Sequence, residues 1–339
     1  MGKTHTKLPS KLFILFFLVI FSFPSFVSAQ IYDIDSKAAL LNSKSYPATQ
    51  VTALKVSAPQ AYVDVKGGGT DQLMLEVYGI TDAGRNLSEE EIAAVVARDF
   101  NIVIEEADGI LSITALRKPE AVVDENTRLS FHILARNKLD SELKIGAGSA
   151  NITRIQGDQL IKTEGGSIQL ESVVGSVNGA TGSGEIAASN IRGNVDLQGG
   201  QGSVHLSNIM GHVKVQTTLG PISGSGIAGD FNASSTGGSI RVTELNGKVI
   251  ARSEAGSIYA GFTALRQDGN ISTTSGNIQL SIPRNSKANF DLKATNVTPF
   301  NLAGFEGIRS RDILEGKLNG GGVVLKAVAN PGDIQISLN

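Results

Sequence analysis

Thirteen glycines recur at intervals of nine residues, and none is missing from the series. They are Gly148, Gly157, Gly166, Gly175, Gly184, Gly193, Gly202, Gly211, Gly220, Gly229, Gly238, Gly247 and Gly256. Chance does not produce such a run in a chain with 39 glycines among 339 residues. A fixed period of this kind is typical of a repeat architecture, in which each repeat packs on the next one.

Apolar side chains accompany these glycines at a fixed offset. Two residues after each glycine from Gly166 on, the chain has Ile168, Val177, Ile186, Val195, Val204, Val213, Ile222, Phe231, Ile240, Val249 and Ile258. Polar residues such as Gln169 and Asp196 follow, and apolar or small residues come next. This alternation is typical of half-buried β-strands. Glycine suits the corners between them, because it accepts positive φ angles and close backbone contacts.

The true repeat has eighteen residues, because the two nine-residue halves differ. An aliphatic residue lies seven positions after every second glycine, beginning with Gly148. The glycines between them, beginning with Gly157, have a polar or small residue at that position. The aliphatic residues are Ile155, Val173, Ile191, Ile209, Ile227 and Leu245. We therefore expect an all-β fold, a parallel β-solenoid of the β-helix or β-roll kind. Each eighteen-residue coil should hold two strands and two corners.

Other solenoids fit the period less well. A left-handed hexapeptide helix would repeat every six residues. A calcium-binding β-roll has nine-residue halves but needs an aspartate in each half, whereas we expect Asp158, Asp196 and Asp230 to be isolated and in no common column. Calcium also needs several converging oxygen ligands. The pattern favours a two- or three-faced solenoid with an apolar core and without a metal or cofactor.

The N-terminus has the pattern of a cleaved signal peptide over residues 1–29. Three lysines precede an unbroken apolar run over 12–21, and Val27-Ser28-Ala29 is a small-residue cleavage site. Ten apolar residues are too few to span a membrane, which takes about 20. We therefore expect a mature chain without a transmembrane segment, located in the periplasm, on the cell surface or in the medium.

Three further parts follow the signal peptide. Residues 30–142 are predicted to form an N-terminal β-rich cap with one helix, which begins at the capping box of Ser88 and Glu91. Residues 143–282 form the regular solenoid, and residues 283–339 form C-terminal capping strands. Caps are expected because open strand edges at the ends of a solenoid promote aggregation.

The composition excludes several classes of partner and site. Removing the three lysines of the signal peptide leaves 27 basic residues against 32 acidic ones, a formal charge of −5. Neither nucleic acid nor an anionic membrane is indicated by this balance. The chain has no cysteine, which excludes disulfides, thiolate metal sites and a lipid-anchored N-terminus.

The repeat resembles a known bacterial family. The carriers of the resemblance are the segment Thr163-Glu164-Gly165-Gly166-Ser167-Ile168, the repeated G-x-[IV] steps through Ile258, and the ending Leu318-Asn319-Gly320-Gly321-Gly322 with Gly332-Asp333-Ile334. Over roughly residues 50–339 the chain is similar to the putative-adhesin, β-strand-repeat domains of unknown function, related to head-domain adhesins of Bacteroidetes. The resemblance implies an exported, non-enzymatic β-solenoid and brings no catalytic residues with it.

Candidate chemical motifs have simpler structural explanations. Residues 224–229 match G-x-G-x-x-G, but a dinucleotide site needs a helix after it, and no helical pattern follows. His132, His205 and His212 are interpreted as solvated surface residues, with His205 and His212 on different faces. We find no nucleophile elbow, P-loop or zinc motif. The sequence thus predicts no catalytic, cofactor-binding or metal-binding residues.

One column of hydroxyls leaves two interpretations open. Thr163, Thr181, Thr217, Ser235 and Ser253 are spaced so that they stack, with Gly199 interrupting the column. Stacked hydroxyls could bind ice or a sugar lattice, but a hydroxyl ladder inside a corner is favoured.

The function predicted from the sequence is that of an exported, non-enzymatic adhesin or envelope interaction protein. Its partner would be a cell-surface protein or a polysaccharide. One alternative is a carbohydrate-binding or polysaccharide-active protein on the same scaffold. Another is a periplasmic component of signalling or envelope maintenance.

Overall fold

The computed structural model describes residues 38–68, 71–81, 87–119, 121 and 127–339. Residues 36–339 form one compact unit. The predicted signal peptide lies outside the described residues. Among the described helices, none is long and apolar enough to cross a membrane.

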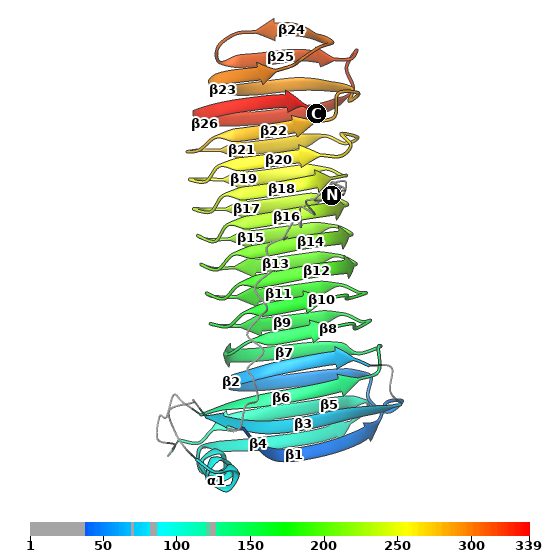
Figure 1. Ribbon diagram of the computed structural model, residues 1–339, viewed down its shortest axis with the longest axis vertical. Helices are drawn as coiled ribbons and strands as arrows, with labels where there is room; N and C mark the ends of the chain where they lie inside the picture. The colour runs from blue at the N-terminus through cyan, green and yellow to red at the C-terminus, as the bar shows by residue number, and fades with distance from the viewer. Residues whose placement is uncertain (1–37, 69–70, 82–86, 120, 122–126) are drawn as a thin grey trace, which may run out of the picture. The chain divides into compact units, whose positions relative to one another are not determined.

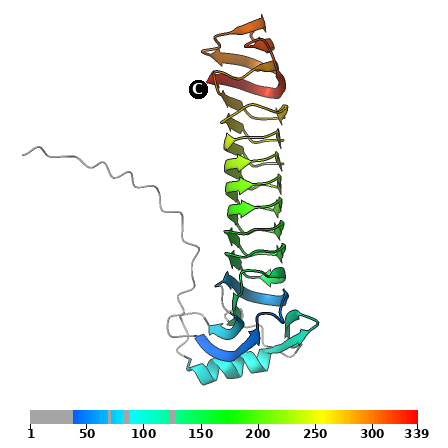
Figure 2. The same cartoon turned by 90° about the vertical axis from the view of Figure 1, so that its right-hand side faces the viewer.

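Two stacks of short parallel strands make the regular solenoid (Figures 1 and 2). The first stack contains β7 (Asp140–Ala147), β9 (Gln159–Thr163), β11 (Val177–Thr181), β13 (Val195–Gly199), β15 (Val213–Thr217), β17 (Phe231–Ser235), β19 (Val249–Ser253) and β21 (Gly269–Thr273). The second stack contains β8 (Ala150–Thr153), β10 (Ile168–Glu171), β12 (Ile186–Arg192), β14 (Val204–Met210), β16 (Ile222–Ala228), β18 (Ile240–Leu245), β20 (Ile258–Phe262) and β22 (Ile278–Ile282). The chain alternates between the stacks, so each coil contributes one strand to each.

Equivalent residues of successive coils lie in register along each stack. Ile186, Val204, Ile222 and Ile240 are direct partners in the second stack, and none is more than 1% exposed. They form one inward column of the core between the stacks. After β20 the register skips, because Ile258 pairs with Ile278. The extra residues lie in the corner between β20 and β21, where Leu265 is buried.

Stacked glycines line both corners. A Cβ at Gly184, Gly202, Gly220 or Gly238 would lie 1.9–2.1 Å from the carbonyl oxygen of the glycine one coil earlier. At the other corner, Gly175, Gly193, Gly211 and Gly229 meet the preceding glycine in the same way and have φ angles of 146–152°. No side chain fits so close to a backbone oxygen, so glycine sets the spacing of the coils.

The hydroxyl column lies inside the first of these corners. Thr181 donates to the carbonyl oxygen of Gly166 at 2.8 Å and accepts from the backbone N–H of Gly184 at 3.1 Å. Ser253 bonds Gly238 and Gly256 in the same way. These side chains are buried. The column is therefore a ladder that holds the turn, and it presents no exposed lattice to ice or sugar.

The N-terminal end is organised around one coil-length strand. The first half of β2 (Ala53–Gly67) pairs with β5 (Ile110–Arg117) and β7, and its second half pairs with β6 (Thr127–Ala135) and β8. Pro59 lies where the strand passes from one stack to the other. Beyond this coil, β1 (Ala38–Pro47) and β3 (Gln72–Thr81) extend β6 in antiparallel fashion, and β4 (Phe100–Ala107) does the same for β5.

The helix α1 (Glu89–Asp99) lies at the outer extremity of this end, against β1, β3 and β4 (Figure 1). Its predicted capping box is confirmed, since Ser88 and Glu91 bond each other's backbone N–H groups. Ile92 and Val96 are buried, and Gly79 of β3 allows the close approach, because a Cβ there would lie 2.7 Å from Val96 Cγ2. The helix thus closes the apolar core.

The C-terminal end contains a second coil-length strand. Beyond β22, β23 (Ala288–Phe300) forms an outer coil, and β25 (Ile313–Leu318) and β24 (Phe305–Arg309) extend it antiparallel. The last strand, β26 (Val323–Leu338), returns and inserts between β23 and the strands β21 and β22. Since β2 and β26 pair in both stacks, hydrogen bonds join the described strands into one sheet. The prediction of an all-β parallel solenoid is confirmed, and coil pairing continues past residues 143 and 282.

Candidate binding groove

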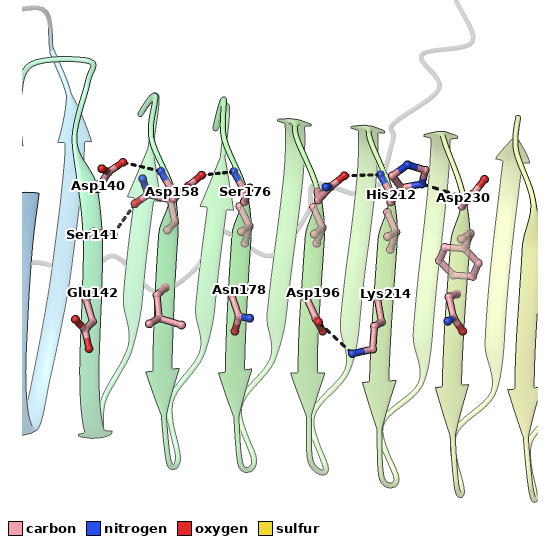
Figure 3. Close-up of a pocket in the computed structure, with 18 of the residues that line it drawn as sticks. Asp140, Ser141, Glu142, Asp158, Ser176, Asn178, Asp196, His212, Lys214 and Asp230 are labelled. Carbon is pink, nitrogen blue, oxygen red and sulfur yellow. Dashed lines mark hydrogen bonds and ion pairs between the residues drawn. The ribbon is translucent and has the colours of Figure 1, made fainter.

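An open groove of about 770 Å³ lies on the outward face of the first stack, from β2 to β19. Figure 3 shows its two rows of side chains. The corner rim consists of Asp140, Asp158, Ser176, Asn194, His212, Asp230 and Lys248. The strand rim consists of Glu142, Leu160, Asn178, Asp196, Lys214, Asn232 and Ile250, with Lys55 at its N-terminal end.

The strand period and the glycine corners together place these rims. From Asp158 on, each corner-rim residue directly follows a corner glycine, as Ser176 follows Gly175, and the strand-rim residue comes two positions later. The residue between them, such as Val177 or Val195, points into the core because side chains alternate along a strand. The groove therefore runs between two outward columns across the strands.

Hydrogen bonds between coils hold the corner rim in place. Asp140 Oδ1 accepts the backbone N–H of Asp158 at 2.8 Å, and Asp158 Oδ1 accepts that of Ser176 at 2.9 Å. Asn194 Oδ1 accepts the N–H of His212 at 3.2 Å. An aspartate and an asparagine thus do the same structural work at equivalent positions.

Ion pairs occupy most of the charged groups of the groove. Lys214 Nζ lies 3.1 Å from Asp196 Oδ2. His212 Nδ1 lies 3.4 Å from Asp230 Oδ2, a contact that is an ion pair only when the imidazole is protonated. Glu142 contacts Lys144, and that hydrogen bond, helped by the charges of Lys144 and Lys55, holds the pKa of its carboxyl below the usual value. These pairs reduce the charge that the middle of the groove presents.

Two carboxylates differ from the rest. Among the described residues, Asp140 and Asp158 contact no cation, and each uses only Oδ1 to accept a backbone N–H. The expectation that Asp158 and Asp230 share no column was wrong: they lie four coils apart in the corner rim, because both directly follow glycines of the same corner. The column between them carries serine, asparagine and histidine, so it is not the aspartate ladder of a β-roll.

The outward face of the second stack has a different chemistry. Its columns are rich in hydroxyls, among them Ser189, Ser207 and Thr243. A smaller pocket of about 430 Å³ contains Tyr259. The guanidinium of Arg241 lies 4.2 Å from the ring centroid of Tyr259, and the ring lies against Gly261. With one face of the ring covered by Arg241, the tyrosine offers little stacking surface.

A polar network on the second face escaped the sequence analysis. Ser130 Oγ lies 2.9 Å from His132 Nε2, and His132 Nδ1 lies 3.6 Å from Asp64 Oδ2. Asp64 is about seventy residues away from Ser130 and His132 along the chain. The three side chains meet because β2 pairs with β6. Ser130 has no accessible surface, so no substrate reaches its hydroxyl in this arrangement. The set therefore serves as a packed hydrogen-bond network.

The electrostatics of this network follow from burial and pairing. Burial opposes ionisation of Asp64, but hydrogen bonds from His132 and Lys66 outweigh it and hold the pKa of Asp64 below its usual value. Asn151 also donates to Asp64 at 2.7 Å. Burial beside Asp64 raises the pKa of the Tyr62 hydroxyl to about 12.

The other motifs of the sequence are dispersed. Residues 224–229 lie in β16 and the corner after it, and the next element is the strand β17. His205 lies on the face of the second stack beside Glu185, whereas His212 lies in the groove. Within the described part of the chain, no three His, Cys, Asp or Glu residues are grouped in a way that could hold a metal ion.

The chain matches the model of one known family and is similar to several solved structures. The model of the family described as Toastrack DUF4097 matches residues 101–337. A putative adhesin from Parabacteroides distasonis is 16% identical, with a TM-score of 0.35, and the alignment covers 89% of this chain and 98% of that one. Putative adhesins from Parabacteroides merdae and Bacteroides fragilis are 14% and 12% identical, with TM-scores of 0.34 and 0.33; each alignment covers 89% of this chain and 97% of the other. No curated protein matches the chain.

Proposed function

We propose that this chain, which belongs to the toastrack DUF4097 family, is an exported, non-catalytic binding protein that holds an extended ligand in the groove of the first stack. Adhesion to a surface polymer is the activity that this geometry supports best. Export rests on the signal-peptide pattern of residues 1–29. The observation that carries the proposal is the groove itself, which crosses eight adjacent strands from β2 to β19 with hydrogen-bonding groups on both rims.

The rims suit binding better than chemistry. A catalytic pair of acids or a nucleophile and base must converge on one reacting atom. Here the charged groups are distributed along the strands, and most of them pair with a neighbour on the same rim. Such a surface offers many similar weak contacts, and an extended ligand adds them up along its length.

The absence of cysteine from the sequence allows a direct test. Ser176→Cys places one thiol in the groove, and Ser167→Cys places one on the opposite face; both residues are exposed and directly follow corner glycines. Each variant is labelled with a bulky maleimide and applied to immobilised cell-envelope polysaccharide. We expect the label at 176 to lower retention at least tenfold and the label at 167 to leave it unchanged. Equal retention of the two labelled proteins would overturn the proposal.

A further inference from the structure

We propose that the groove selects a linear glycan that bears free amino groups. The inference rests on the proposed binding function and adds the chemical class of the ligand. Its basis is the charge of the groove, the repeat of its rims and the pairing of its backbone.

The lateral dimensions of the groove favour a single extended chain. Eight strands about 4.8 Å apart make a length of roughly 34 Å, and the two rims stand two residues apart along each strand, a spacing of roughly 6.6 Å. An α-helix is about 10–12 Å wide and would rest on the rims without entering. The occupant therefore has to be narrow as well as long.

The backbone of the first stack excludes the usual mode of peptide binding. Strands β7 to β19 each pair with a strand on both sides, so the groove offers no free edge to which a peptide strand could add. An extended peptide also repeats every two residues, at about 6.6 Å, out of step with strands about 4.8 Å apart. A sugar unit of an extended glycan advances by a length close to the strand spacing, and it carries hydroxyls on both edges for the two rims.

The charge of the groove selects among glycans. Its lining contains five carboxylates (Asp140, Glu142, Asp158, Asp196 and Asp230) and three lysines (Lys55, Lys214 and Lys248), a formal charge of −2 with His212 neutral. The unpaired carboxylates, Asp140 and Asp158, are neighbours on the corner rim, and each leaves Oδ2 without a protein partner among the described residues. One ammonium group of the glycan can lie between these two carboxylates and contact both, whereas a polyuronate would be repelled by them.

The test compares glucosamine hexamer with N-acetylglucosamine hexamer by calorimetric titration of the full mature chain at low ionic strength. We expect the amine-bearing hexamer to bind roughly tenfold more tightly, since two exposed ion pairs make a difference of this order. Raising the salt concentration should remove most of the difference, because exposed charges are screened.

Isosteric variants assign the effect to the two aspartates. In the double variant Asp140→Asn and Asp158→Asn, each amide oxygen can still accept the N–H of the next coil, as Asn194 does, so the fold is expected to persist. The variant should bind both hexamers equally. The matched control Glu171→Gln removes one carboxylate from the exposed face of the second stack and should keep the preference for the amine.

Two outcomes would overturn this inference. One is equal affinity of the wild type for both hexamers; the other is a preference that survives in the double aspartate variant. Either result leaves the proposed function standing if the label at residue 176 still blocks retention on envelope polysaccharide. If the label at residue 176 does not lower retention, the proposed function itself is wrong. The two failures can therefore be distinguished.

Discussion

The two ends of the solenoid use the same device in opposite chain order. At the N-terminal end, β2 forms early in the chain, and the later strands β5 to β8 add to both its edges. At the C-terminal end, the outer coil β23 is made first, and β26 fills the space between β23 and the last regular coil. The C-terminal end therefore depends on β26, which pairs on both edges, whereas β1 at the N-terminal end pairs with β3 alone among the described strands.

Among the changes that test the difference between the two ends, removal of β26 should disturb the folded monomer most. Deletion of residues 323–339 leaves the edges of β21, β22 and β23 without partners and uncovers the apolar core. We expect end-to-end oligomers or precipitation, because open strand edges pair with one another. Size-exclusion chromatography with light scattering measures the outcome.

The matched deletion removes β1 by starting the chain after residue 48. It opens one edge of β3 and should leave a folded monomer of lower stability. If the chain without β26 stays monomeric and folded while the chain without β1 aggregates, the difference between the two ends is the reverse of the one inferred here.

The regular coils should be next in sensitivity. Ile222 is 1% exposed in the middle of the inward column, and Ile222→Asp would bury a carboxylate without a partner. We expect a loss of several kcal/mol in the free energy of unfolding, measured by chemical denaturation. Ser223→Asp, on the outward side of the same strand, is the control and should change the stability by less than about 0.5 kcal/mol. Similar losses for both variants would contradict the inward assignment.

Alanine substitutions should lower the melting temperature more at a glycine of the regular coils than at a glycine of the C-terminal end, and this effect is smaller than that of Ile222→Asp. Gly202→Ala places a Cβ 2.0 Å from the carbonyl oxygen of Gly184, so successive coils must move apart. Gly320→Ala meets nothing within 4 Å, and its φ of +84° costs an alanine about 1–2 kcal/mol. Melting temperatures should therefore fall further for Gly202→Ala. An equal or smaller fall for Gly202→Ala would show that the glycine column is not needed for spacing.

The smallest effect concerns pH at the N-terminal end. The pKa of Asp64 is depressed in the folded chain, so its contribution to stability is present above the unfolded value of about 3.9 and is lost as the pH falls through the folded value. The difference in melting temperature between the wild type and Asp64→Asn should be largest near pH 6 and shrink below pH 4. A difference that does not change with pH would show that Asp64 acts through shape alone.

Much of the fold could be predicted because every coil of the solenoid has the same pattern of glycine, apolar and polar residues. Each coil contacts mainly the coils before and after it, so a residue such as Ile222 has the same environment as Val204 and Ile240. Each column of similar residues in the sequence therefore corresponds to one structural position that recurs in every coil. The helix was predictable for a local reason, since its capping box involves only residues 88–91.

The ends and the candidate site could be predicted less well. The pairing of β26 between β22 and β23 depends on which edge the chain returns to, and no local pattern encodes that choice. The groove was not predicted, because its charged residues, such as Asp158 and Asp196, are far apart along the chain. Its signal is present in the sequence, at the first and third positions after every second glycine, but only the stacking shows that these positions border one channel.

The length of the coil, the inward columns and the need for glycine at the corners can all be derived from the amino-acid sequence, because they follow from a strict period and from the size of side chains. The pairing of strands in space was needed to show that the hydroxyl column of Thr181 and Ser253 faces inward. It was also needed to show that Asp140 and Asp158 border a groove, and that Asp64 meets His132 across β2 and β6. These contacts join residues through strand pairing, and pairing between non-neighbouring segments depends on the whole arrangement of the chain.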